Sequence, residues 1–422
     1  MRPSRPPDPA LDRDALGQPT PHQAQSFWRR RAAEFSSANY HFKTDLADGQ
    51  ARGFARQFDL LHEEFTRRFP DLPVRSPLRL RVFIFSRRAD YLQELRTRWA
   101  VEAEDTGGLF FVADSSAIVA FWTEDLPPRR VHHVMQHEAF QQFAFTRFGD
   151  DLPVWLSEGL AEYYGYAVMA HDQLVAGQAG PRVIDSVKQA IELKTHVPLP
   201  RLMAITPDEW RRQVGARRAR LLYDQVWSLA HFLLHADGGQ YRAPLMRYLR
   251  LLNNGTRSKD AFSRAFGDDL DALEARWRDH AAALQPGAFV TAIERIEFLA
   301  EGALALSREG VVPESLEEMK THLRRIDFTH EVGFQALATE VRADDEESFE
   351  IPSPRDDEDY RKPVFIVETL SLWDLSPRQR RLEQIQPTPA VIRTDHLRPY
   401  DLLVEWERDD ETGVLRYRLL AR

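Results

Sequence analysis

The residues His137, Glu138 and Gln141 are the part of this sequence best suited to chemistry. Residues four apart share one face of a helix, so His137 and Gln141 can approach the same metal ion. The residue after the first ligand can then direct a carboxylate at a metal-bound water, and Glu138 has that place. Imidazole is a strong zinc ligand, whereas a carboxamide is weak toward zinc and brings no charge. Gln141 therefore predicts a site that binds zinc weakly or not at all.

A second segment, residues 155–163 (WLSEGLAEY), carries two carboxylates one helical turn apart. We expect a helix here, from which Glu158 supplies a further metal ligand. Glu162 could then accept a hydrogen bond from the far ring nitrogen of His137. Support of this kind orients the histidines in metal sites.

His133 offers a second possible ligand pair for the same chemistry. It lies four residues before His137, so the pair could bind a metal ion together with Glu158. This arrangement resembles the inverted H-x-x-E-H motif, but Gln136 stands where the carboxylate base would be. The simpler explanation, which we favour, is that His132 and His133 cap the helix start or face solvent.

Together, residues 131–164 resemble the gluzincins, the thermolysin-like and aminopeptidase-like zinc metallopeptidases, and are most similar to their poorly characterised bacterial members. The family pattern is H-E-x-x-H followed by W-L-x-E-G-x-A-x-Y. The resemblance implies that His137 and Glu158 are metal ligands and that Glu138 is the general base, with Gln141 in place of the second histidine.

A later segment, residues 223–229 (YDQVWSL), resembles a helix that follows the site in the same family. The resemblance gives Tyr223 the place of a residue that hydrogen-bonds the developing oxyanion. The alternative is that Tyr223 simply packs on an amphipathic helix. Both interpretations stay open at this point.

Composition limits the classes of protein that the chain can belong to. Its 422 residues are 43% hydrophobic and 29% charged, which suits a globular protein of two or three domains. A formal charge of −9 argues against nucleic acid as a partner, and the lack of cysteine excludes disulfides and thiolate ligands. The sequence shows neither a secretory signal nor an apolar run of about 18 residues, so we expect a cytoplasmic protein without a membrane partner.

Hydrophobic periodicity predicts the elements that must position these residues. The predicted elements are strands at 40–46 and 78–85, helices at 48–69 and 91–99, a hairpin at 108–122, the motif helix from 127 to before 149, a helix from Glu158 to 169, and helices near 210, at 220–234 and at 261–277. This order predicts a small mixed sheet packed on the motif helix. Residues 107–112 or 118–121 could form an edge strand that pairs with a substrate, and 171–205 are expected to be irregular and to wrap the cleft.

The fold class predicted is α+β, with three regions. Residues 1–37 are expected to form a disordered or loosely packed arm, 38–285 a gluzincin-like domain with a helical subdomain, and 286–422 a C-terminal α+β domain. In the last region we predict helices at 292–306 and 315–326, and strands at 334–341, 364–372, 390–394, 402–407 and 414–420.

Three functions are consistent with these patterns. The first is a pseudopeptidase, a metallopeptidase-like protein with a degenerate zinc site whose cleft binds a peptide or protein. The second is an active zinc-dependent hydrolase in which Gln141 or His133 completes the site with His137 and Glu158. The third places the function in the C-terminal domain, as an interaction module whose acidic loops meet a basic partner.

Overall fold

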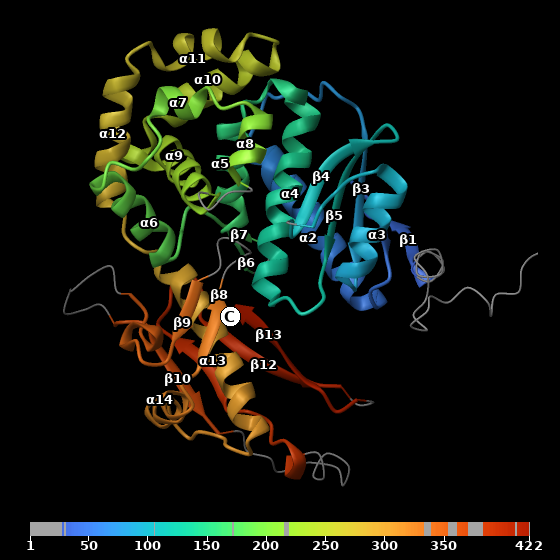
Figure 1. The fold of residues 1–422 in the computed structure, drawn as a ribbon, viewed down its shortest axis with the longest axis vertical. Helices are drawn as coiled ribbons and strands as arrows, with labels where there is room; N and C mark the ends of the chain where they lie inside the picture. The colour runs from blue at the N-terminus through green and yellow to red at the C-terminus, as the bar shows by residue number, and fades with distance from the viewer. Residues whose placement is uncertain are drawn as a thin grey trace, which may run out of the picture. The chain divides into compact units, whose positions relative to one another are not determined.

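The computed structural model is drawn in Figure 1. It describes residues 28, 31–104, 106–170, 173–214, 219–332, 339–352, 361–369, 383–409 and 412–421. The chain divides into two compact units, and each is described by itself below. The first contains residues 1–152 with 252–255, and the second contains 153–251 with 256–422.

The first unit is built on a five-stranded mixed sheet with the order β1-β2-β3-β5-β4. Its strands are β1 (Ala33–Ser36), β2 (His41–Thr44), β3 (Arg79–Phe85), β4 (Gly108–Ala113) and β5 (Ser116–Trp122). β2, β3 and β5 run parallel, whereas β1 and β4 are antiparallel to their neighbours. The predicted mixed sheet is thus present. β1 lies inside the interval 1–37, most of which falls outside the described residues.

The pairing order decides between the two candidate edge strands. β5 is hydrogen-bonded to β3 on one side and to β4 on the other. It therefore cannot pair with a further strand, and the prediction for 118–121 was wrong. β4 lies at the end of the sheet, so of the two predicted segments it alone can offer an edge.

Helices cover both faces of this sheet: α2 (Asp48–Arg68) and α4 (Pro128–Phe148) on one, α3 (Arg88–Trp99) on the other. Side chains alternate between faces along a strand. Phe121 of β5 accordingly contacts Phe54 and Phe58 of α2, whereas its neighbours Ala120 and Trp122 pack in the cluster that includes Tyr91 of α3.

Two contacts fix α4 on the sheet. The buried amide nitrogen of Gln142 donates to the carbonyl oxygens of Arg81 at 3.1 Å and Ala117 at 2.7 Å. Gly108 of β4 has no Cβ, and a Cβ there would overlap the side chain of Val134. The edge strand and the motif helix can approach closely only because this position is glycine.

The second unit begins with a group of helices. Its elements up to residue 283 are α5 (Val154–Gly165), β6 (Val168–Ala170), β7 (Gln173–Val175), α6 (Pro181–Glu192), α7 (Leu199–Met203), α8 (Pro207–Val214), α9 (Ala219–Gly239), α10 (Arg242–Asn253), α11 (Ser258–Phe266) and α12 (Leu270–Ala283). α5 ends at Gly165 and not near 169, because the chain turns into the β6–β7 hairpin. The expectation of an irregular stretch at 171–205 was also wrong, since this interval contains α6 and α7.

α5 packs closely against α9, and Gly159 makes this possible. A Cβ at Gly159 would lie 2.6 Å from the backbone oxygen of Val226. Backbone atoms cannot move aside as a flexible side chain can, so any larger residue at Gly159 would separate the helices. Gly159 therefore lies on the face of α5 that packs against α9.

The rest of the second unit is α+β. It contains α13 (Ala288–Arg308), α14 (Leu316–Arg325), the pair β8 (Thr329–Val332) and β9 (Thr339–Arg342), and a four-stranded sheet of β10 (Val364–Glu368), β11 (Val391–Asp395), β12 (Leu402–Arg408) and β13 (Leu415–Ala421). All pairings in that sheet are antiparallel, and it packs with α13 around one core. The predicted strands included 334–338 and 370–372, which lie outside the described residues. The α+β fold class is confirmed.

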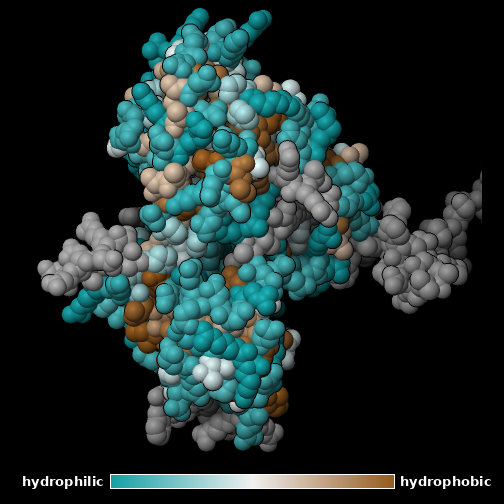
Figure 2. All heavy atoms as spheres, turned by 60° about the vertical axis from the view of Figure 1, so that its left-hand side comes forward, coloured by the Kyte–Doolittle hydropathy of each residue, from teal (hydrophilic) through white to brown (hydrophobic). Residues whose placement is uncertain are grey.

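The surface carries no broad apolar area on the face that Figure 2 shows, where hydrophobic residues form small separate patches among hydrophilic ones. The large hydrophobic residues that are exposed in the described part of the chain are Val74, Val112, Leu193, Val364, Ile385 and Val414. None of the described helices is long and apolar enough to cross a membrane.

Candidate metal centre

His133 and His137 form the centre of the α4 face. Their rings stack with centroids 6.4 Å apart and an angle of 26° between the planes. Each side chain is only 9% exposed. The sequence places them on successive turns, and α4 therefore presents two nearly buried imidazoles side by side.

Gln141 lies on the same face, one turn beyond His137. Its amide nitrogen is 3.1 Å from Nε2 of His137. An amide nitrogen is a donor, so Nε2 acts as the acceptor and the ring proton is on Nδ1. The lone pair of Nε2 then accepts a hydrogen bond, which a metal ion at this atom would have to displace. Of the ligands that the resemblance implies, the carboxamide of Gln141 is the weak one toward zinc.

Glu138 is also nearly buried, with 9% of its surface exposed. Burial raises the pKa of the Tyr91 phenol, and the negative charge of Glu138 contributes to this increase. Tyr91 is hydrogen-bonded at 2.8 Å to Thr106, which precedes β4. Glu138 thus lies on the side of α4 near Tyr91. Its role as a general base stays a prediction.

On α5, Glu162 is almost fully buried at 2% exposure, whereas Glu158 is partly exposed. Glu162 acts electrostatically on two other groups of the second unit, Asp224 and Tyr166. Burial raises the pKa of Asp224 to about 6; Arg182 and Arg220 oppose this change and Glu162 adds to it. Glu162 also contributes to the raised pKa of Tyr166, which is due chiefly to burial. Glu162 is therefore a buried carboxylate close enough to Asp224 and Tyr166 to affect the pKa of both.

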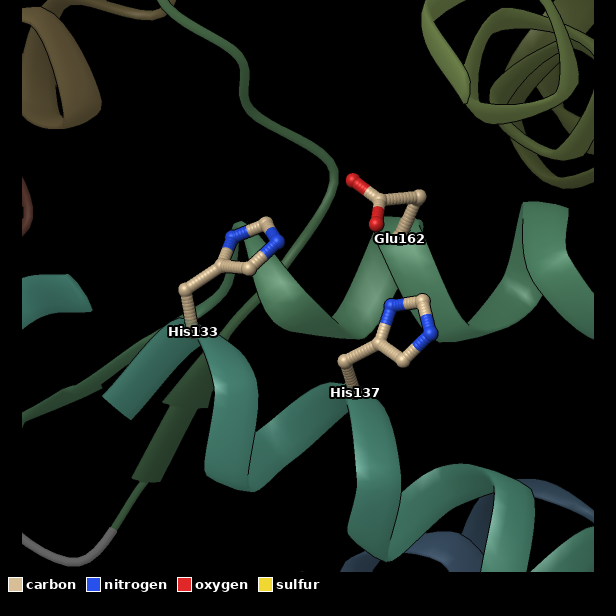
Figure 3. A group of neighbouring side chains, drawn as sticks. All are labelled: His133, His137 and Glu162. Carbon is tan, nitrogen blue, oxygen red and sulfur yellow. The ribbon is translucent and has the colours of Figure 1, made fainter. Parts of the chain in front are cut away.

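His133, His137 and Glu162 come together in one cluster (Figure 3). One possible ligand atom from each residue lies within 4.8 Å of the other two. Within the described residues, no other group of three His, Cys, Asp or Glu side chains is this close. Two imidazoles and one carboxylate form a ligand set that zinc accepts.

Proximity of the donor atoms alone does not make this cluster a metal site. A tetrahedral zinc ion with bonds of about 2.0–2.1 Å separates its ligand atoms by about 3.4 Å. The limit of 4.8 Å that the cluster meets is a looser condition than zinc coordination. The cluster has donors of the right kind, and its binding of a metal ion stays a prediction.

The cluster differs from the predicted ligand set. Sequence reasoning gave Glu158 the role of ligand and Glu162 a supporting role, yet Glu162 belongs to the cluster and Glu158 does not. His133, for which a cap or solvent position was favoured, is buried in it. The spacing of four residues between His133 and His137 was the signal in the sequence that the two rings share a helix face. The sequence does not indicate which carboxylate of α5 faces them. The ligand roles stay predictions.

Tyr223 lies on α9 and is partly buried. Its ring packs edge-on against Trp210, with centroids 5.4 Å apart and an angle of 87°. This is the packing that the simpler interpretation expects. A role for its hydroxyl toward a substrate stays a prediction.

Comparison with known proteins adds no relative. Neither the protein-family models nor the curated proteins give a match to this chain. The resemblance to gluzincins therefore depends only on the motif residues and their spacing.

Proposed function

We propose that this protein is a pseudopeptidase, which holds a peptide or protein partner in a peptidase-like cleft without hydrolysing it. The observation that carries the proposal is the 3.1 Å contact between Gln141 and Nε2 of His137. It puts a hydrogen bond where a zinc peptidase needs a second ligand and a free imidazole lone pair.

Each of the two possible ligand assignments lacks one part that hydrolysis needs. With His137 and Glu138 as ligand and base, the second ligand is the carboxamide of Gln141. With His133 and His137 as the ligand pair, the place of the base is taken by Gln136, which is only 3% exposed. A carboxamide is a weak zinc ligand in the first case, and in the second it cannot accept a proton from a metal-bound water at neutral pH.

The edge of β4 supports peptide binding as the remaining function. β4 is the last strand of its sheet, and among the described residues no strand pairs with its outer edge. Val112 of this strand is 45% exposed. An extended peptide could add to this edge through backbone hydrogen bonds, with specificity from alternate side chains.

A second candidate function follows from the cluster of His133, His137 and Glu162. With their donor atoms at the separation of about 3.4 Å that tetrahedral zinc requires, these side chains could hold zinc as an atypical ligand set. An active zinc-dependent hydrolase of this kind would need another carboxylate as base, because Gln136 cannot serve. Glu138 is the candidate nearest in sequence.

A hydrolysis assay tests the proposal. Wild type and Glu138→Gln are incubated with a fluorescence-quenched peptide library, with and without added zinc. We expect no zinc-dependent cleavage by either protein. Zinc-stimulated cleavage that Glu138→Gln abolishes would refute the pseudopeptidase and support the second candidate. Cleavage that is equal in both proteins identifies a contaminating peptidase, which a further purification step removes.

A further inference from the structure

The segment 176–180, between β7 and α6, lies against the α5–α9 pair. The carbonyl oxygen of Gly177 is 3.1 Å from Nε2 of His231 on α9. Gly177 has a φ of +83°, and a Cβ there would lie 2.7 Å from Nε2 of His235 and 3.0 Å from the hydroxyl of Tyr163. Those two groups are themselves hydrogen-bonded at 2.7 Å. The backbone of the segment therefore packs directly against the Tyr163–His235 hydrogen bond, which joins α5 to α9.

The same segment is held from its other side by the start of α13. The amide of Gly287 donates to the carbonyl of Ala179 at 2.9 Å, and the amide of Val290 donates to Oε1 of Gln178 at 3.4 Å. A Cβ at Gly287 would lie 2.6 Å from Cβ of Gln178. The packing between segment 176–180 and α13 has no room for one additional carbon atom.

A second connection runs from α13 to the end of α5. A Cβ at Gly180, the residue that precedes α6, would lie 2.6 Å from the carboxyl carbon of Glu294 on α13. The carboxylate is thus placed at the N-terminus of α6, where the helix dipole favours a negative charge. Arg182 in the first turn of α6 donates to the hydroxyl of Tyr166 at 3.3 Å. Tyr166 is the residue that follows α5.

His231 and His280 determine which atoms donate and which accept in the contact with Gly177. Burial, together with the nearby His235 and His280, lowers the pKa of His231 to about 3, so this ring is neutral at ordinary pH. A neutral ring that donates through Nε2 to Gly177 must accept through Nδ1, and Nε2 of His280 lies 3.0 Å from Nδ1. The chain from α12 through His231 to Gly177 is therefore a defined series of hydrogen bonds.

From these two connections we infer that α13 is a positioning element for α5, acting through segment 176–180 and the N-terminus of α6. The C-terminal region is then part of the framework that sets Glu158 and Glu162, and not a separable module. That α13 belongs to the same compact unit as α5 agrees with this. The functional importance of the framework depends on the proposed site, but its physical test does not.

The competing explanation is that α13 merely packs on segment 176–180. In that case the Gly159–Val226 contact with α9 would hold α5 by itself. The two explanations differ in how far a disturbance at Gly287 travels. If α13 positions α5, the disturbance reaches Tyr163; if it only packs, the disturbance stops at segment 176–180.

A matched pair of glycine substitutions in the full chain distinguishes them. Gly287→Ala adds the carbon that meets Gln178, whereas Gly53→Ala in α2 adds one with nothing within 4 Å. Hydrogen exchange is followed by mass spectrometry over 158–166, 176–180 and 48–68. We expect Gly287→Ala to speed exchange about tenfold in both of the first two regions and to leave α2 unchanged. Gly53→Ala should change neither 158–166 nor 176–180.

Faster exchange in 176–180 with no change in 158–166 would overturn the inference. Glu294→Gln, which keeps the side-chain shape, provides a second variant in case Gly287→Ala does not fold. It should speed exchange in 158–166 about threefold, and an unchanged rate there would also contradict the inference. The ¹⁵N signals of the His235 ring should shift in Gly287→Ala, because its bond to Tyr163 is disturbed, and stay constant in Gly53→Ala. None of these outcomes depends on whether the protein cleaves peptides.

Discussion

The side-chain amide nitrogen of Gln141 lies 3.1 Å from Nε2 of His137, one helical turn away on the same face of α4. A histidine at position 141 would supply a metal ligand of its own. The glutamine instead donates a hydrogen bond to the lone pair of Nε2 in His137. The proposed pseudopeptidase function depends chiefly on this one relationship.

Replacing Gln141 by histidine should create or tighten a zinc site. The new imidazole adds a strong ligand and ends the hydrogen bond of the carboxamide to His137, so we expect zinc to bind at least about tenfold more tightly. Calorimetric titration with zinc measures this. The control is Gln141→Leu, which removes the hydrogen bond without adding a ligand. Equal tightening in both variants would show that release of His137, and not the new imidazole, is responsible.

Substitutions of the neighbouring residues His133 and His132 provide a matched test of zinc binding by the cluster. His133 is a member of it, whereas His132 packs edge-on against Phe54 with centroids 6.2 Å apart. Any zinc that wild type binds should be lost in His133→Ala and kept in His132→Ala. Binding that survives His133→Ala would show that the ion is held by His137 and other residues, outside this cluster.

His132 should make stability depend on pH. Burial lowers its pKa to about 4 in the folded protein, from an unfolded value of about 6.5. Between these two values the unfolded chain binds the extra proton, so stability falls as the pH drops from about 6.5 toward 4. Each such group contributes a slope of up to about 1.4 kcal/mol per pH unit. Denaturant unfolding across this range should give a shallower profile for His132→Leu, and parallel profiles would contradict the assignment.

Gly159 should tolerate no side chain. Its Cβ would meet the backbone of α9 at Val226, so Gly159→Ala should lower the free energy of unfolding by about 1–3 kcal/mol. Gly53→Ala, in open space on α2, should raise it by about 0.5–1 kcal/mol, because alanine is the better helix former. Denaturant titration measures both. A neutral Gly159→Ala would mean that the two helices can separate without cost.

Local patterns predicted the elements around the site well. The strands and helices from 41 to 148 follow strong hydrophobic periodicity, and the structure has each of them within a few residues. α6 was missed because Gly180 and Pro181 were interpreted as helix breakers. In the structure Gly180 precedes the helix and Pro181 occupies its first turn, a position that suits proline.

The relations that the sequence could not predict are those between distant segments. Whether β4 or β5 forms the edge depends on the parallel pairing of β5 with β3, and no local pattern specifies it. Glu162 belongs to the cluster and Glu158 does not, although both lie on α5 one helical turn apart and no local pattern distinguishes them. Residue types and spacing therefore identified the helix pair, but not which carboxylate it presents.

The zinc content of the protein as purified without chelator tests the central claim most directly. Elemental analysis after dialysis gives the number of zinc ions for each chain. Because Gln141 replaces a ligand and holds Nε2 of His137, we predict well below one equivalent. A value near one equivalent that survives dialysis would contradict the degenerate site and show that the chain holds zinc through another set of ligands.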